Sequence, residues 1–396
     1  MTDTPALRLQ PPPFATDAAL TAVWDALPQA RVVGGAVRDA VAGRPVADID
    51  LATPLPPDAA TAALVAAGLR VVPTGLAHGT ITAVAEARGF EITTLRHDVE
   101  TDGRHAVVAF TSDWRADALR RDFTINALSM ARDGAIFDYF GGVADLHDGR
   151  VRFVGDADAR IREDYLRILR FFRFQARYGL GSPDPGTIAA LRAGVPGLAR
   201  LSVERIWGEL SRILAAPDPV AAIRLMHDLG ILRAVAPELS APERLAGLRA
   251  AGAPHDPILR LAAMLTGDAL SFAERLKLSN QERDRLVRLG SVPSPDPSAD
   301  NAALRRLLAD FSRTDLIDRT WLNGDPAGPG LRRRLAALPI PVFPLEGRDV
   351  LALGIAPGLR VGALLRDVRQ WWLAGGCVAD HPAANAELAR RACTPG

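Results

Sequence analysis

The chain has 396 residues, of which 48% are hydrophobic and 23% are charged. This balance is typical of a globular protein of several domains, and no stretch is apolar for long enough to cross a bilayer. The segment from Met1 to Phe14 lacks the basic start and apolar core of a signal peptide, so we expect a cytoplasmic protein without membrane contact. Two cysteines cannot form a disulfide framework or a four-ligand zinc site. The net charge of +1 by itself indicates no partner. Lys277 is the single lysine, so nearly all of the positive charge comes from arginine, whose planar guanidinium group suits phosphates.

Short strands and helices alternate in the first 150 residues, and helical patterns continue from about Arg160 onward. The apolar spacing predicts, in chain order, a strand at 31–33, a helix at 36–41, a strand at 46–51, a helix at 58–67 and a hairpin of strands at 80–85 and 90–95. The predicted fold class is therefore α+β, with a small sheet in a head and a long helical part behind it. We expect a head at 25–150, a helical neck at 151–218, a helical body at 219–300 and a helical tail at 301–396.

A glycine pair and two aspartates form the most informative segment of the head. Asp48 and Asp50 lie two residues apart on the predicted strand, so both carboxylates point to one face. They repel each other unless a cation lies between them, and magnesium prefers such ligands together with substrate phosphates. Gly34 and Gly35 open the preceding helix, where free backbone N–H groups suit a triphosphate, and Arg38 follows on its first turn. An isolated Asp-x-Asp is usually a solvated turn, but the whole succession favours a metal-dependent site for a triphosphate.

The run Gly-Gly-Ala-Val-Arg-Asp at 34–39, followed by Asp-Ile-Asp at 48–50, resembles the signature of class II tRNA nucleotidyltransferases and bacterial poly(A) polymerases. Three later segments resemble the same family in order: a second head motif at 120–127, a head-to-neck junction at 138–146 and a nucleotide-selecting neck helix at 163–174. The resemblance covers about residues 30 to 215 and continues more loosely beyond them. It implies a polymerase-β-like head followed by an extended all-α neck, body and tail, with the tail binding tRNA.

This resemblance also implies an activity, namely the template-independent addition of CCA to the 3′ end of tRNA from CTP and ATP. Asp48 and Asp50 are then expected to hold two Mg²⁺ ions, and Glu91 is either a third metal carboxylate or an exposed strand glutamate. Arg121 is expected at the triphosphate, and Asp122 at the ribose or at a neighbouring arginine. The sequence indicates no protein partner.

Six arginines occupy the predicted neck helix between residues 160 and 177, which also carries an apolar stripe that faces a core. Asp164, Arg167 and Arg170 are successive i,i+3 neighbours away from that stripe, on a face that could also be a solvated surface with local ion pairs. A carboxylate accepts from the amino group of cytosine or adenine while a guanidinium donates to the ring nitrogen, and uracil and guanine present the opposite polarity. The resemblance assigns this selection to Asp164 and Arg167 and places Arg170 and Arg173 at nucleotide-binding positions.

Three other functions remain open. A poly(A) polymerase shares the head and much of the neck, although the extra basic motif of that branch is missing. A partial enzyme that adds only CC or only the last A shares nearly everything, although the stretch from His97 to Leu119 is long enough for the head loop that CC-adding forms lack. A catalytically silent RNA-binding protein on this fold would not need Asp48 and Asp50.

Overall fold

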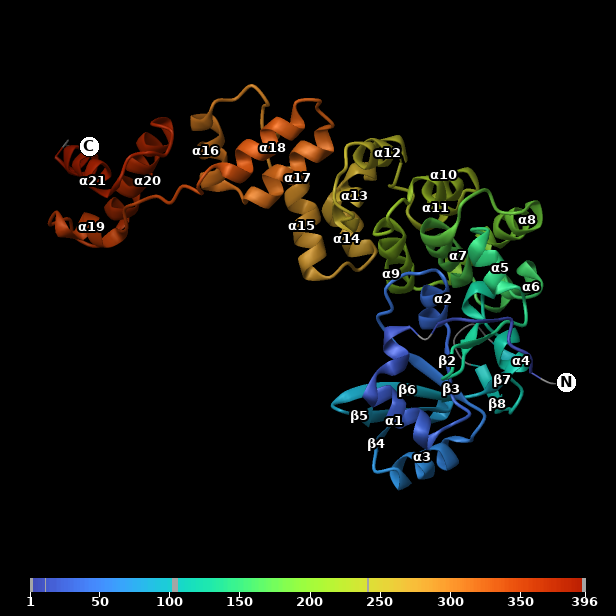
Figure 1. Ribbon diagram of the computed structural model, residues 1–396. Helices are drawn as coiled ribbons and strands as arrows, with labels where there is room; N and C mark the ends of the chain where they lie inside the picture. The colour runs from blue at the N-terminus through green and yellow to red at the C-terminus, as the bar shows by residue number, and fades with distance from the viewer. Residues whose placement is uncertain (1–2, 11, 102–105, 241, 394–396) are drawn as a thin grey trace. The chain divides into compact units, whose positions relative to one another are not determined.

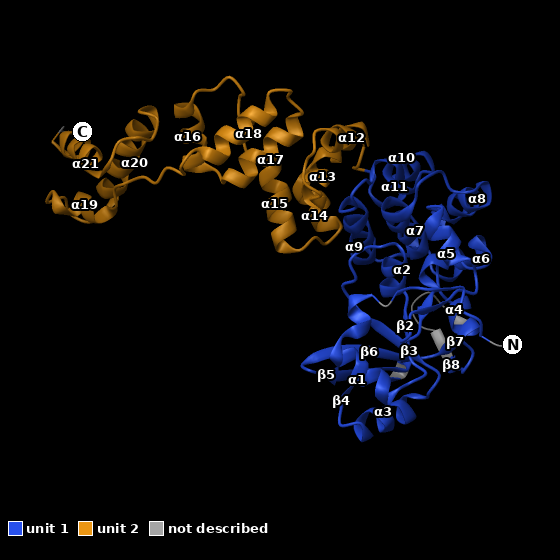
Figure 2. Cartoon of the chain, viewed as in Figure 1, with its two compact units in different colours: residues 1–237 blue, residues 238–396 orange. Residues whose placement is uncertain are grey.

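The computed structural model describes residues 3–10, 12–101, 106–240 and 242–393. The chain divides into two compact units, residues 1–237 and residues 238–396 (Figure 2), and this division falls within the segment that was expected as the body. No helix in the described ranges combines the length and the apolar character that crossing a membrane requires.

An eight-stranded mixed sheet forms the centre of the head (Figure 1), in the spatial order β1-β10-β9-β2-β3-β6-β5-β4. Its strands are β1 (Leu7–Arg8), β2 (Arg31–Val33), β3 (Asp50–Thr53), β4 (Arg70–Gly75), β5 (Thr80–Ala85), β6 (Arg88–Thr94), β9 (Ser129–Met130) and β10 (Ala135–Phe137). β3 runs parallel to β6, and the other pairs are antiparallel. The separate hairpin of β7 (Arg96–Thr101) and β8 (Ala106–Phe110) begins one residue before the stretch at 97–119 that was expected as the head loop, and residues 102–105 of that stretch lie outside the described residues.

The strand at 31–33 and the hairpin of β5 and β6 confirm the sequence prediction, whereas the predicted strand at 46–51 is wrong in its start. The observed strand begins at Asp50, so Asp48 lies in the segment before it. The antiparallel register explains the difference, since Val33 pairs with Asp50 and is the last residue of β2. The next residue, Gly34, turns away with φ 66°, so β2 provides no partner beside Asp48.

Helices cover the sheet and enclose the first core. These are α1 (Ala18–Ala26), α2 (Gly35–Val41), α3 (Pro57–Ala66), α4 (Trp114–Leu119) and α5 (Gly142–His147), with 3₁₀ turns at Pro13–Thr16, Leu76–His78 and Thr124–Asn126. Leu20 and Trp24 of α1 are buried in the same core as Val32 and Ile92 of the sheet, although α1 begins before the expected head boundary at residue 25. The Trp24 indole N–H donates to the Ala30 carbonyl at 3.0 Å, which satisfies its one polar group inside the core.

The remaining helices of the first unit are α6 (Ala157–Glu163), α7 (Leu166–Tyr178), α8 (Pro185–Gly194), α9 (Val203–Leu214), α10 (Val220–Asp228) and α11 (Ile231–Val235), with a 3₁₀ turn at Val195–Arg200. Buried aromatic rings join α7 to the second head motif, because Phe123 lies 4.8 Å from Phe153 and 5.2 Å from Phe174 between ring centroids. On another side α7 packs against α9. The second head motif and α9 therefore both pack against α7.

The described residues of the second unit form helices joined by loops, with one isolated β-bridge between Leu239 and Leu265. It contains α12 (Pro242–Ala250), α13 (Pro257–Met264), α14 (Ala269–Arg275), α15 (Asn280–Ser291), α16 (Asn301–Asp310), α17 (Arg313–Asn323), α18 (Gly328–Ala337), α19 (Gly347–Ala352), α20 (Leu359–Ala374) and α21 (His381–Ala392). One core gathers around Leu304 and Leu335, and another around Val350 and Leu388. The mixed sheet in the head and the all-helical remainder confirm the predicted α+β class.

Candidate functional site

Three carboxylates lie together at the start of β3. The parallel register of β3 and β6 places Asp50 opposite Glu91, and Asp48 lies two residues upstream. The pKa of Asp50 is raised above its ordinary value, first by partial desolvation and then by the negative charges of Glu91 and Asp48, while Arg121 opposes the rise. A divalent cation between these side chains would relieve their repulsion.

The donor set fits a hard cation that shares its ligands with a substrate. Within the described ranges no three His, Cys, Asp or Glu side chains complete a metal centre by themselves. Magnesium usually keeps several waters and takes one or two carboxylates together with substrate phosphates. A site of this kind therefore needs few protein ligands, because the substrate supplies the others. Asp50 with either neighbouring carboxylate supplies those protein ligands.

Gly34 forms a turn that lets Arg121 lie close to the backbone between β2 and α2. Its φ of 66° is strained for any residue with a side chain, and a Cβ atom there would lie 3.1 Å from Nη1 of Arg121. Two groups hold Arg121 in place, since Nη2 lies 3.2 Å from the buried Asp117 carboxylate and Nη1 donates to the Asn126 carbonyl at 3.3 Å. A permanent cation is therefore fixed beside the glycine turn.

A buried hydrogen-bond network connects α7 to α2 through the second head motif. Arg170 donates from Nε to Asp122 at 2.7 Å, and the Asn126 amide donates to the other oxygen of Asp122 at 3.1 Å. The side-chain oxygen Oδ1 of Asn126 in turn accepts from Arg38 at 2.7 Å. Burial opposes the ionised form of Asp122, but Arg170, Asn126 and Arg167 outweigh it and hold the pKa of that carboxyl below its ordinary value. Asp122 thus contacts an arginine, and its expected contact with the ribose stays a prediction.

The expected neck helix is broken at Asp164, which corrects the prediction that Asp164 and Arg167 are i,i+3 neighbours on one helix. Asp164 has extended backbone angles, φ −154° and ψ 108°, and lies between α6 and α7. Its Oδ1 accepts from the backbone N–H of Leu166 at 3.1 Å, and its Oδ2 accepts from Arg205 at 2.7 Å. Tyr165 follows and packs closely on Gly197, where a Cβ atom would lie 2.0 Å from the ring. Tertiary contacts on both sides of the break thus replace the helical hydrogen bonds.

The arginines of α7 also have separate partners. Arg167 forms an ion pair with Glu163 and donates to the Arg160 carbonyl at 2.9 Å. Arg173 lies 3.1 Å from Glu209 of α9. Asp164 is therefore paired with Arg205, and Arg167 is paired with Glu163. Both Asp164 and Arg167 lie at the wall of the same cavity.

A cavity of about 500 Å³ brings most of the predicted site together in the first unit. Its wall contains these predicted residues: Gly34, Gly35, Arg38, Asp50, Arg121, Asp122, Asp164, Arg167, Arg170 and Arg173. Asp48 and Glu91 are not part of this wall and reach the site through their neighbour Asp50. The size lies within the range of small-ligand sites, and the wall is dominated by guanidinium groups, as a polyanionic ligand requires.

Sequence reasoning missed two residues that hold the site in place. Arg205 on α9 is the ion-pair partner of Asp164, and Asp117 on α4 binds both Arg120 and Arg121. Asp117 precedes the arginines by three and four residues, which is a signal that local spacing could have supplied. Arg205 lies 41 residues after Asp164, so no local pattern indicates this pair.

Comparisons with known proteins agree with this geometry. The model of the poly(A) polymerase head domain matches residues 30–152, and a model described as a probable RNA and SrmB-binding site of polymerase A matches residues 182–242. The mitochondrial CCA tRNA nucleotidyltransferase 1 of Mus musculus is 38% identical over 364 residues, covering 87% of this chain and 83% of the relative. The CCA-adding enzyme of Geobacillus thermodenitrificans is 36% identical over 334 residues, covering 79% of this chain and 80% of the relative. The crystal structure of the Bacillus stearothermophilus CCA-adding enzyme in complex with CTP has a TM-score of 0.73 at 29% identity, covering 94% of this chain and 97% of that one.

The mixed sheet, the carboxylates on adjacent strands and the arginine-lined cavity define a nucleotidyltransferase. Enzymes of this class typically use divalent metal ions. The extent and the identity of the matches are more specific: the chain belongs to the family of class II CCA tRNA nucleotidyltransferases and poly(A) polymerases.

Proposed function

We propose that this protein adds CCA to the 3′ end of tRNA, using CTP and ATP as substrates and Mg²⁺ as cofactor. The observation that carries this proposal is the shared cavity, in which Asp50, the glycine turn and the pair Asp164 and Arg167 meet. The first two suit the metal and the triphosphate, and the pair suits a cytosine or adenine edge. Similarity to CCA-adding enzymes over most of the chain supports the same conclusion.

The reaction joins the RNA 3′ oxygen to the α-phosphorus of the incoming nucleotide and breaks the bond from that phosphorus to the bridging oxygen of pyrophosphate. The hydroxyl proton goes to solvent or to a nearby carboxylate. Asp48, Asp50 and, in this proposal, Glu91 hold Mg²⁺, which when bound stabilises the negative charge that develops on the phosphate oxygens and makes the hydroxyl more acidic. Arg121 binds the triphosphate, and Arg38, Arg170 and Arg173 complete the positive wall. The cytoplasmic location stays a prediction, because the Mus musculus relative is a mitochondrial enzyme.

Base selection needs no nucleic-acid template in this proposal. The Asp164 carboxylate accepts from the amino group of cytosine or adenine, and Arg167 donates to the adjacent ring nitrogen. Uracil or guanine would place a carbonyl oxygen against the Asp164 carboxylate and a ring N–H against the Arg167 guanidinium. Such a mismatch costs a few kcal/mol when the groups are buried.

The test uses tRNA transcripts that end before CCA, after C and after CC, incubated with magnesium and labelled CTP and ATP, singly and together. Products that stop at CCA support the proposal. Long A tails would identify a poly(A) polymerase, and a stop at CC would identify a partial enzyme. Absence of incorporation by well-folded protein would instead favour a silent RNA-binding protein.

A further inference from the structure

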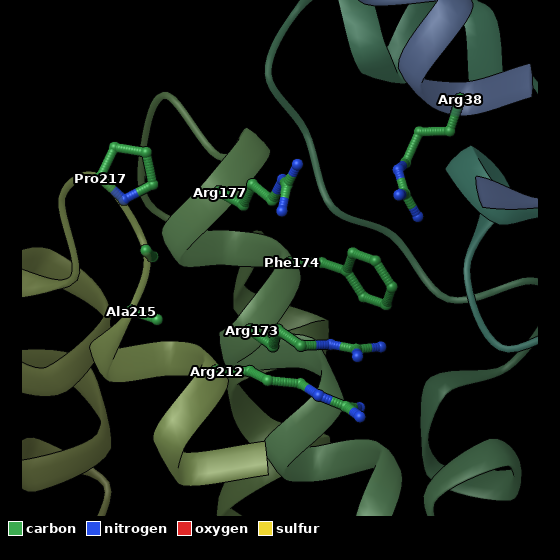
Figure 3. Close-up of a pocket in the computed structure, with 8 residues that line it drawn as sticks. Arg38, Arg173, Phe174, Arg177, Arg212, Ala215 and Pro217 are labelled. Carbon is green, nitrogen blue, oxygen red and sulfur yellow. The ribbon is translucent and has the colours of Figure 1, made fainter. Parts of the chain in front are cut away.

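A second arginine-lined pocket of about 310 Å³ adjoins the nucleotide cavity in the first unit. Arg38, Arg173 and Phe174 line both of them, while Arg177 and Arg212 line the second pocket alone. Figure 3 shows Arg173 and Arg212 extending in the same direction from α7 and α9, with Arg38 reaching in from α2. The chain after α9 closes another side with Ala215, Ala216 and Pro217, which carry no charge.

Positive charge in this pocket exceeds the negative charge around it. Four guanidinium groups line it, and no carboxylate is part of its wall. Glu209 lies behind the wall at 3.1 Å from Arg173 and 3.6 Å from Arg212, and Asp39 lies 3.2 Å from Arg38. Arg177 forms no ion pair within the part of the chain that the structure describes. An anion is therefore the complementary ligand.

Arg173 lies close to other positive charges in this pocket. Burial lowers the pKa of Arg173 to about 10, and the positive charges of Arg170 and Arg212 add to this effect, while Glu209 opposes it. Phe174 is buried between the guanidinium groups, with its ring centroid 4.6 Å from Arg173 and 5.1 Å from Arg38, which holds both arginines in place. A negatively charged group in the pocket would meet donors that are already oriented.

We propose that this pocket binds a backbone phosphate of the RNA next to its reacting 3′ end. The inference rests on the proposed function. A nucleoside triphosphate needs the carboxylates for its metal, and those lie at the other cavity with Asp50 and the glycine turn. A phosphodiester needs only donors and positive charge, which this pocket supplies. Because the two pockets share Arg38 and Arg173, a strand whose 3′ hydroxyl is at the metal passes directly along this second pocket.

The test is a double variant, Arg177→Ala with Arg212→Ala, which leaves the wall of the nucleotide cavity intact. Both residues are exposed, so the protein is expected to fold, and the melting temperature checks this. Arg192→Ala on α8 is the matched control, since this exposed arginine lines neither pocket. Binding of tRNA that ends before CCA is measured without nucleotides at several salt concentrations, and the KM for CTP is measured separately.

The double variant should bind tRNA about tenfold more weakly than the unsubstituted protein, with the KM for CTP unchanged. The slope of log Kd against log salt concentration should fall by about 1. Arg177→Lys with Arg212→Lys should restore most of the binding, and Arg192→Ala should change neither quantity. Unchanged tRNA affinity would overturn the inference. An increased KM for CTP with unchanged tRNA affinity would also overturn it and would assign the pocket to a free triphosphate or pyrophosphate. Because binding is measured without catalysis, failure of the unsubstituted protein to add nucleotides would refute the proposed function separately.

Discussion

Arg205 donates to Oδ2 of Asp164 at 2.7 Å and thereby links α9 to the break between α6 and α7. The other oxygen of Asp164 accepts from the backbone N–H of Leu166 at 3.1 Å. Both oxygens are therefore held, and the carboxylate has a defined orientation at the cavity wall. In the proposed function this orientation determines which base edge is accepted.

Removal of Arg205 should reduce base discrimination. We expect Arg205→Ala to lower the preference for CTP over UTP by about tenfold, because an unheld carboxylate loses the fixed geometry that penalises the wrong base. Arg205→Lys should keep part of the preference, since it retains one donor. The measurement is kcat/KM for each nucleotide on tRNA that ends before CCA, with Arg192→Ala as the control. A lower melting temperature with an unchanged preference would mean that Arg205 only stabilises the fold.

The raised pKa of Asp50 makes opposite predictions for stability and activity. The folded state binds more protons than the unfolded state between the ordinary and the raised pKa, so stability falls as the pH rises through this window. At neutral pH the ionised Asp50 therefore destabilises the metal-free protein. Asp50→Asn should raise its melting temperature, and it should lower incorporation by about a hundredfold or more because the metal ligand is lost.

Magnesium provides the control for this variant. The unsubstituted protein should melt at a higher temperature when Mg²⁺ is added, and Asp50→Asn should lose most of this increase. Asp58→Asn, which neutralises an acidic residue in the first turn of α3, should retain the response to Mg²⁺. If Asp50→Asn melts at a lower temperature than the unsubstituted protein without metal, the carboxylates do not repel each other as described.

The β7–β8 hairpin should affect the addition of A more than that of C. Asp117 accepts from the backbone N–H of Arg96 at the start of β7 and also holds Arg121, so the hairpin is connected to the proposed triphosphate site. We expect replacement of residues 99–108 by a short glycine linker to spare CC addition and abolish A addition. The comparison uses tRNA ending before CCA with CTP, and tRNA ending in CC with ATP. Equal loss of both activities would contradict a selective role of the hairpin.

Local sequence was sufficient for the glycine turn, for the strand before it at 31–33 and for the hairpin of β5 and β6. Gly34, Gly35 and Asp50 lie where strand and turn chemistry predict them, because each depends on residues within a few positions. Asp48 was wrongly placed on a strand, because the end of its partner strand at Val33 is decided by tertiary pairing.

The break at Asp164 could not be predicted, because the residues around it are compatible with a continuous helix and contain neither glycine nor proline. The contacts that favour the break come from Gly197 beside Tyr165 and from Arg205 beside Asp164, which are far along the chain. Helical periodicity carries no information about such partners, so the sequence predicted the wrong backbone geometry for Asp164, although Asp164 and Arg167 both lie at the cavity wall.

The most direct test of the account is the base preference of Asp164→Ala at both steps of the reaction. The preference for CTP over UTP is measured on tRNA ending before CCA, and the preference for ATP over GTP on tRNA ending in CC. If one protein pair replaces a template for both bases, this single variant should lose both preferences by about tenfold or more, while tRNA binding stays unchanged. Retention of either preference at the level of the unsubstituted protein would contradict the claim that Asp164 and Arg167 select both nucleotides.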